Sequence, residues 1–165
     1  EQKIELLDYM EKLGIQKVDL GLPGAGPFHV EHIDAMLTHI TENEYKIRPG
    51  AAVRTLMQDI EPLVELQEKH GIPIQASAFL GTSPIRQFAE GWTMDKLLST
   101  MEKAVSFAVE NDVPVMFVTE DTTSSSSSSS LSSITVLLIF CVTSSSSLST
   151  TDDAIFSLSS DDRVI

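Results

Sequence analysis

Apolar residues over the first 123 positions follow two kinds of spacing, one typical of helices and one typical of buried strands. Apolar residues three or four positions apart predict helices over residues 1–13, 28–43, 56–70 and 93–108. Short runs that are apolar nearly throughout predict strands over residues 15–21, 47–54, 72–80 and 113–119. Gly14, Asn43 and Gly71 stand where the first three helices would end, and Thr93 stands where the fourth would begin.

The apolar faces of the first two helices define a predicted core. The first helix is expected to bury Ile4, Leu7, Met10 and Leu13, and the second, which begins at Phe28, to bury Val30, Ile33, Leu37 and Ile40. Residues 81–92 show no such face and are predicted to be a loop.

Four apolar strands separated by helices predict parallel βαβ units and an α/β fold. Right-handed crossovers of this kind build either an open doubly wound sheet or a (β/α)8 barrel. A complete barrel takes roughly 250 residues, so four strands in the first 123 residues would make half of one.

Composition changes sharply after residue 123. Residues 1–123 hold all eight glycines, all seven prolines and all four histidines, whereas 17 of the 42 residues in 124–165 are serine. Polyserine buries too little apolar surface to offset its chain entropy. We therefore expect a folded domain over residues 1–123 and a Ser-rich, low-complexity tail over residues 124–165. The tail is either genuine or a product of frameshifted or placeholder sequence. Its one strand-like run is ITVLLIFCVT, residues 134–143.

Charge and cysteine content exclude several classes of function. The formal net charge of −13 disfavours nucleic acid and anionic membrane surfaces as partners. The single cysteine, Cys141, permits neither an intrachain disulfide nor a cysteine-based zinc site. The longest apolar run is about half of the roughly 20 residues that a membrane helix needs, and no signal peptide is visible. We expect a cytoplasmic protein. Glu1 already lies in a helical pattern, which suggests that a longer chain has been cut there.

Polar residues stand where each predicted strand ends, and in parallel α/β folds these ends form the functional edge. Four such places are Asp19 to Gly21, Arg54-Thr55, Gly81 to Pro84, and Glu120-Asp121. Asp19 is expected to be either paired or ligand-facing, because it interrupts an apolar strand. Arg54 can bind an anionic substrate or pair with a neighbouring acid. Glu120 and Asp121 can belong to a site or to a solvated loop, with Asp121 also a candidate helix cap.

Two further patterns are weak indications of a ligand. His29, His32 and His39 share one side of the second helix, and His29-x-x-His32 can in principle bind a metal. A solvated helix surface is the favoured interpretation. LPGAGP is glycine-rich but fits neither GxGxxG nor a Walker loop.

Taken in order, several motifs resemble the DRE-TIM metallolyase superfamily, and within it the 2-isopropylmalate synthase and homocitrate synthase families. The resemblance covers residues 1–123. It rests on DLGLPGAGP, AAVRT, FLGTSPIR, AEGWTMDKLLSTMEKAVSFAVEND and VPVMFVTEDTT.

The resemblance implies a (β/α)8 barrel, of which this chain carries about strands 2–5. It also implies a divalent metal (Mg, Mn or Zn) that polarises the substrate. The implied reaction, part of amino-acid biosynthesis, is a Claisen-type condensation of acetyl-CoA with a 2-oxo acid. FLGTSPIRQFAEGWT and VTEDTT favour this reaction over the alternative, C–C cleavage as in 3-hydroxy-3-methylglutaryl-CoA lyase or an aldolase of the same superfamily.

The resemblance also assigns site residues. Glu120 corresponds to the acidic residue at the exit of the fifth strand and is the predicted catalytic residue. The predicted substrate-binding residues are Asp19, Gly21, Leu22, Pro23, Arg54, Ser83 and Arg86.

Other family features have no counterpart in this sequence. The Arg-Asp pair of the family's first strand is absent, Ser124 replaces the arginine expected after EDTT, and residues 124–165 contain no histidine for the His-x-His metal pair. No metal ligand is therefore assigned, and we expect this chain alone not to catalyse the condensation. Three hypotheses remain: a segment of a synthase, a segment of a lyase, and a non-catalytic truncated half-barrel. A half-barrel would expose strand edges, so we expect it to associate with the missing half or to form a homodimer.

Overall fold

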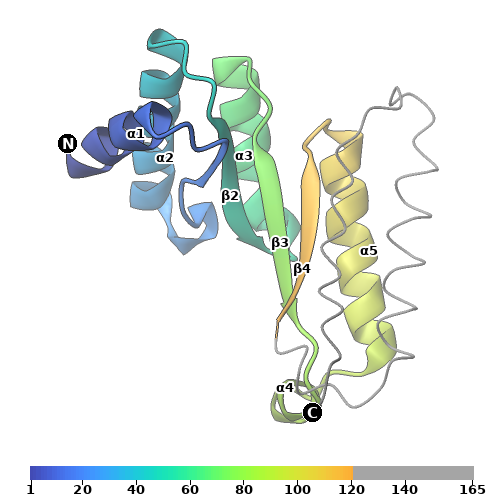
Figure 1. Ribbon diagram of the computed structural model, residues 1–165. Helices are drawn as coiled ribbons and strands as arrows, with labels where there is room; N and C mark the ends of the chain where they lie inside the picture. The colour runs from blue at the N-terminus through green and yellow to red at the C-terminus, as the bar shows by residue number, and fades with distance from the viewer. Residues whose placement is uncertain (121–165) are drawn as a thin grey trace, which may run out of the picture.

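A computed structural model of the chain describes residues 1–120 (Figure 1). The predicted boundary at residue 123, the Ser-rich tail and Asp121 lie outside these described residues. The elements, in chain order, are α1 (Gln2–Lys12), β1 (Lys17–Asp19), the 3-10 helix η1 (Pro23–Ala25), α2 (Pro27–Glu42), β2 (Arg48–Arg54), α3 (Met57–His70), β3 (Gln75–Gly81), α4 (Pro84–Glu90), α5 (Met94–Glu110) and β4 (Val115–Glu120).

Local chemistry sets the helix ends close to the predicted positions. Thr93 caps α5, and its hydroxyl oxygen accepts a hydrogen bond from the Lys96 amide. Gly71 ends α3 with a φ of 67°, a left-handed conformation that costs glycine little. Asn43 follows the last residue of α2, as predicted.

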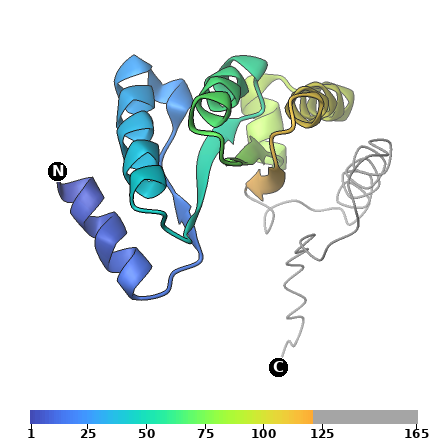
Figure 2. The same cartoon turned by 90° about the horizontal axis from the view of Figure 1, so that it is seen from above.

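The four strands form one parallel sheet in the order β1-β2-β3-β4. A doubly wound sheet reverses its strand order at a switch point, whereas a barrel adds each new strand beside the last. Viewed from above, α2, α3 and α5 lie along the same face of the sheet (Figure 2). The α/β prediction with parallel strands is confirmed, and this arrangement is consistent with part of a barrel.

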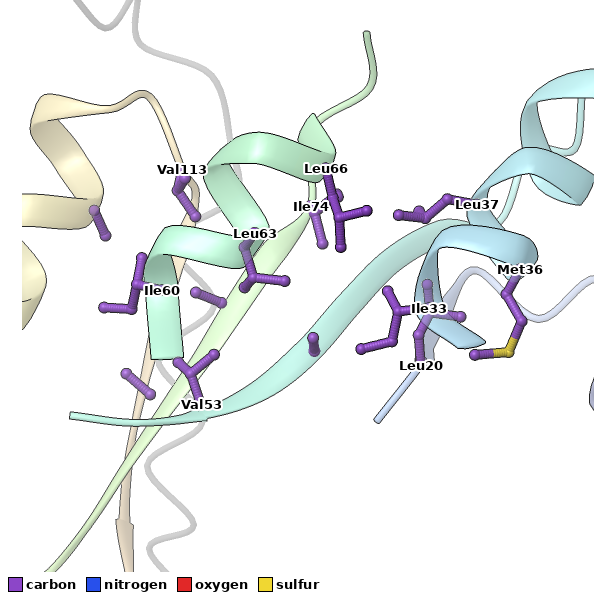
Figure 3. Close-up of a cluster of buried hydrophobic side chains, with 14 of the residues drawn as sticks. Leu20, Ile33, Met36, Leu37, Val53, Ile60, Leu63, Leu66, Ile74 and Val113 are labelled. Carbon is purple, nitrogen blue, oxygen red and sulfur yellow. The ribbon is translucent and has the colours of Figure 1, made fainter. Parts of the chain in front are cut away.

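The core lies between that face of the sheet and the helices. Val53 of β2 lies beneath Ile60 and Leu63 of α3 (Figure 3). On α2, Ile33 lies beside Leu20, and Leu37 lies across from Leu66 of α3. Alanines on the central strands let the helices pack closely, since Ala51, Ala76 and Ala78 are all buried. A second cluster joins β3 to α5 through Leu80, Leu97, Met101 and Val105.

One predicted core residue is wrong, because Leu13 is 77% exposed. Phe28, where the second helix was predicted to begin, is 62% exposed. Successive steps of three residues drift by about 60° around a helix, so the series that starts at Ile4 has left the buried face when it reaches Leu13. Phe28 lies in the first turn of α2, where its ring packs against the His32 ring at a tilt of 55°, with the ring centroids 4.1 Å apart.

The predicted loop over residues 81–92 contains a short helix, α4. Ser83 caps it, Pro84 occupies its first turn, and Gly91 ends it in a left-handed conformation. These are the residue types that begin and end helices, but a seven-residue helix with no buried residue has no apolar periodicity to reveal it.

Polar contacts join the outer helices. His39 donates a hydrogen bond from Nε2 to Asp8 of α1 (2.7 Å), and the Tyr45 hydroxyl donates to the same carboxylate (2.7 Å). The interpretation of the histidine face as solvated is therefore wrong for His39, which is half-buried. Lys69 and His70 of α3 both donate to Asp34 of α2, each at 2.7 Å.

The described residues contain no helix long and apolar enough to cross a membrane.

We predict that Asp34→Asn weakens the contact between α2 and α3. Hydrogen bonds from Lys69 and then His70 lower the pKa of Asp34, so its stabilising contribution is present above the ordinary carboxyl pKa of 3.8 and is lost as the pH falls through the folded-state value. The substitution should lower the free energy of unfolding by about 1 kcal/mol at neutral pH and flatten the acid limb of the stability profile.

Urea denaturation at a series of pH values measures both effects. Glu42→Gln neutralises an exposed carboxylate on the same helix and serves as the control. Equal acid limbs in the Asp34→Asn variant and the unsubstituted chain would contradict the prediction.

Candidate functional site

The carboxyl ends of the four strands lie along one edge of the sheet, because the strands are parallel and adjacent. This edge is at the bottom of Figure 1. Gly81 of β3 pairs in register with Glu120 of β4, and Arg54 of β2 pairs with Phe79 of β3. The four exits thus lie at the carboxyl ends of the strands but are staggered along the sheet, since Asp19 pairs with Gly50, which pairs in turn with Gln75 at the start of β3.

Arg54, the last residue of β2, is bound to an acid that the sequence analysis did not name. Its Nε and Nη2 atoms donate to the two carboxylate oxygens of Asp59, each at 2.7 Å, and its backbone amide donates to Oδ2 at 3.1 Å. Asp59, in the first turn of α3, is 1% exposed, whereas the Arg54 side chain is half exposed. The hydrogen bonds from Arg54 to Asp59 raise the pKa of Arg54. Of the two alternatives for Arg54, pairing with a neighbouring acid is present.

The loop after β1 packs against this ion pair. Nη2 of Arg54 also donates to the backbone oxygen of Gly24, at 3.2 Å. A Cβ at Gly24 would collide with the Asp59 carboxylate, so the loop approaches α3 this closely only because residue 24 is a glycine. Leu22 is half-buried, and Pro23 is buried at the start of η1.

Asp19 shapes the first turn of the same loop. Its Oδ1 accepts a hydrogen bond from the Gly21 amide at 2.8 Å, an Asx-type turn. Gly21 has a φ of 128°, which residues with a side chain rarely adopt. The Gly21 oxygen in turn accepts a hydrogen bond from the Ala52 amide of β2, at 3.0 Å. Asp19 is exposed, so its second carboxylate oxygen stays accessible to a ligand or to water.

Ser83 and Arg86 lie where β3 passes into α4. The Ser83 hydroxyl oxygen accepts a hydrogen bond from the Arg86 amide at 3.2 Å, which leaves its own proton free to be donated to a ligand. Ser83 is buried and Arg86 is exposed. The stem of the Arg86 side chain crosses Gly81, where a Cβ would lie only 3.0 Å from Cγ of Arg86.

Thr82 ties the ends of β3 and β4 together. Its amide and its hydroxyl both donate to the backbone oxygen of Glu120, each at 3.2 Å. Gln87 of α4 donates to the Thr82 oxygen at 2.9 Å. These contacts hold the backbone of Glu120, while its carboxylate is at the exposed end of β4.

Four residues that shape this edge are not among the predicted site residues: Asp59, Gly24, Gln87 and Thr82. An acid five residues after Arg54, in the first turn of the next helix, was a usable signal for Asp59. Thr82 and Gln87 donate to backbone oxygens, and Gly24 acts through its lack of a side chain, so a pattern of residue types does not reveal these partners.

The described residues do not supply a metal centre. Among residues 1–120, no group of three or more His, Cys, Asp or Glu side chains could hold a metal ion. Asp19 and Glu120 belong to the two outermost strands of the four-stranded sheet, with β2 and β3 between them.

A hollow of about 470 Å³ lies at the opposite, amino-terminal edge of the strands. Its lining includes Tyr45 and Arg48 before and at the start of β2, His70 at the end of α3, and Pro73 before β3. It shares no residue with the strand-exit site.

A sheet with sequential parallel strands and polar strand exits is the arrangement of an α/β-barrel segment. No protein-family model matches the sequence. The chain is similar to 2-isopropylmalate synthase from Lactococcus lactis subsp. cremoris (strain SK11). The two are 29% identical over 121 residues, which is 73% of this chain and 23% of that protein.

Two further relatives of the same kinds of synthase are similar to the chain. Homocitrate synthase from Sulfolobus acidocaldarius is 27% identical over 122 residues, covering 73% of this chain and 25% of that protein. 2-Isopropylmalate synthase from Streptococcus gallolyticus is 26% identical over 122 residues, covering 73% and 22%. The resemblance to these synthases is confirmed, and the chain spans about a quarter of the length of the relatives that it matches.

We predict unequal effects from removing the two partners of the buried ion pair. Arg54→Leu leaves the Asp59 carboxylate buried without a cation, whereas Asp59→Leu leaves a half-exposed guanidinium that water can solvate. Arg54→Leu should therefore lower the melting temperature more than Asp59→Leu does. The double variant should have a higher melting temperature than Arg54→Leu alone. Thermal unfolding of the three variants measures this order, and the reverse order for the single variants would contradict it.

A second prediction concerns the link between β3 and β4. Thr82→Val keeps the shape of the buried side chain but removes the hydroxyl donor to Glu120, so it should lower the free energy of unfolding by about 1 kcal/mol. Thr82→Ser keeps the donor and should retain most of the stability. Urea denaturation compares the two variants, and an equal loss in both would show that the hydrogen bond contributes nothing.

Proposed function

We propose that residues 1–120 are part of an enzyme that condenses acetyl-CoA with a 2-oxo acid, in the manner of 2-isopropylmalate synthase. One observation carries the proposal. The strand-exit motifs DLGLPGAGP, AAVRT, FLGTSPIR and VTEDTT follow one another in the order that the synthase families have, and the sheet brings all four exits to one edge. Relatives named as synthases support the same class of reaction.

Each exit offers a group suited to binding or activating a 2-oxo acid. Nη1 of Arg54 takes no part in the contacts to Asp59 and Gly24, and it provides N–H donors for a carboxylate. The Ser83 hydroxyl and the Arg86 guanidinium add donors at the next exit. The turn over Asp19, Gly21, Leu22 and Pro23 forms the wall beyond Arg54. Glu120 is the candidate catalytic acid or base, because it is an exposed carboxylate at the strand-exit edge.

A divalent metal, Mg, Mn or Zn, would polarise the carbonyl group of the oxo acid. The donors among residues 1–120 do not fit such a site, so the proposal assigns metal binding to residues other than these. The roles proposed above for Arg54, Ser83, Arg86 and Glu120 do not depend on where the ion binds.

We further propose that the reaction takes place in the cytoplasm, and that the chain associates with the remaining barrel strands or with a second copy of itself.

The test begins with the transcript that encodes this chain, read across both ends. The encoded full-length protein is then assayed for release of the CoA thiol from acetyl-CoA, with a panel of 2-oxo acids and each of the three metals. We expect thiol release that depends on the oxo acid, and a kcat about 100-fold lower in Glu120→Gln. Glu68→Gln, an exposed acid at the far end of α3, is the matched control and should leave kcat unchanged.

Three results would contradict the proposal. Cleavage of a 3-hydroxyacyl-CoA or a 4-hydroxy-2-oxo acid, without condensation, would identify a lyase or aldolase instead. A kcat unaffected by Glu120→Gln would remove Glu120 from the chemistry. A transcript that ends after Ile165, encoding a chain with no thiol release, would identify a non-catalytic half-barrel.

A further inference from the structure

The loop between β1 and α2 has little regular structure of its own. It contains one three-residue 3-10 helix, Pro23–Ala25, flanked by Gly21 and Gly26 with φ of 128° and 133°. Glycines with such dihedral angles on both sides of a short turn leave the backbone free to take other conformations. Contacts from outside the loop are therefore needed to fix its position.

The Ala52 amide of β2 donates to the Gly21 oxygen at the start of the loop, and Asp59 supports the middle of the loop, beside Gly24. The Asp59 carboxylate occupies the space beside Gly24 that a side chain would fill, and it holds the guanidinium whose Nη2 binds the Gly24 oxygen. Both carboxylate oxygens of Asp59 accept hydrogen bonds from Arg54. Oδ2 accepts from the backbone amide and from Nε, and Oδ1 accepts from Nη2. Burial of Asp59 keeps water from competing for these bonds.

The same contacts orient Arg54. With Nε and Nη2 engaged by Asp59 and Gly24, the planar guanidinium has one orientation, and Nη1 is the nitrogen that remains. The turn over residues 22–25 and the Nη1 atom of Arg54 are therefore fixed by one buried carboxylate, although 30 residues separate Gly24 from Arg54.

We propose that Asp59 is a positioning residue that sets Arg54 and the β1–α2 loop as one unit at the strand-exit edge. Its relevance to catalysis rests on the proposed function, in which both segments contact the 2-oxo acid. Its structural content does not, because it concerns only contacts within the chain.

Backbone amide exchange measured by NMR on the chain tests the proposal without any ligand. In Asp59→Asn, exchange over residues 21–26 should accelerate about tenfold or more, while buried strand amides such as Ala76 keep their rates. The Arg54 Nε–H resonance should lose its hydrogen-bonded chemical shift. Asp34→Asn, which removes a carboxylate that pairs α2 with α3, is the matched control and should leave exchange over residues 21–26 unchanged.

Gly24→Ala approaches the same contact from the loop. It leaves Asp59 and Arg54 chemically intact but puts a methyl group where the carboxylate lies, so it should accelerate exchange over the same residues. Acceleration confined to the loop in either variant supports positioning. Unchanged loop exchange, acceleration spread evenly over the sheet, or unfolding of both variants would overturn it, since the last two show a contact that supports the whole fold.

The two proposals fail separately. Loss of oxo-acid-dependent thiol release from the full-length protein would remove the proposed function and leave the exchange result intact. Unchanged loop exchange in Asp59→Asn would remove the positioning role and leave the assigned reaction untouched.

Discussion

The shared direction of the four strands is the constraint on which the rest of the structure depends. Because every strand runs the same way, each connection must return across the sheet, and right-handed crossovers put the returning helices on one face. Strands and helices that meet at this face therefore need apolar side chains there, and Val53, Leu37 and Leu63 are fully buried at it. The same constraint points all four strand exits in one direction, and polar contacts then join neighbouring exits in two pairs.

Polar contacts at the strand-exit edge connect the exits in pairs. Thr82 joins the end of β3 to the end of β4 by donating its hydroxyl proton to the backbone oxygen of Glu120. Asp59 joins the end of β2 to the loop after β1 through Arg54 and Gly24. Buried polar groups of this kind are costly when unpaired, so each one restricts the local geometry more strongly than an apolar contact of similar size. The edge is thus built from short polar links laid over an apolar sheet.

The sequence predicts the elements well and the site only in outline. Helices and strands follow from apolar periodicity and from end signals such as Thr93 and Gly71, and these are properties of neighbours along the chain. Helix α4 was not predicted because its seven residues, none of them buried, leave no periodic apolar face. Leu13 was misplaced because a three-residue step drifts around the helix.

The partner of Arg54 depends on how the chain folds around it. Asp59 faces Arg54 only because the chain turns between β2 and α3, and Gly24 reaches both only because the β1–α2 loop crosses to α3. The pattern of residue types along the sequence therefore does not predict that Gly24, Arg54 and Asp59 come together. Residue roles such as that of Glu120 depend in addition on substrates, and they stay predictions.

The order of the strands is the claim that supports everything else, and NMR contacts between strand backbones measure it most directly. We predict short amide and Hα contacts between Asp19 and Gly50, between Ala51 and Ala76, and between Ala76 and Val115. These pairs require β1 beside β2, β2 beside β3 and β3 beside β4. Contacts between β1 and β3 in place of those between β2 and β3 would indicate a reversed, doubly wound order. That result would contradict the barrel arrangement and the strand-exit site built on it.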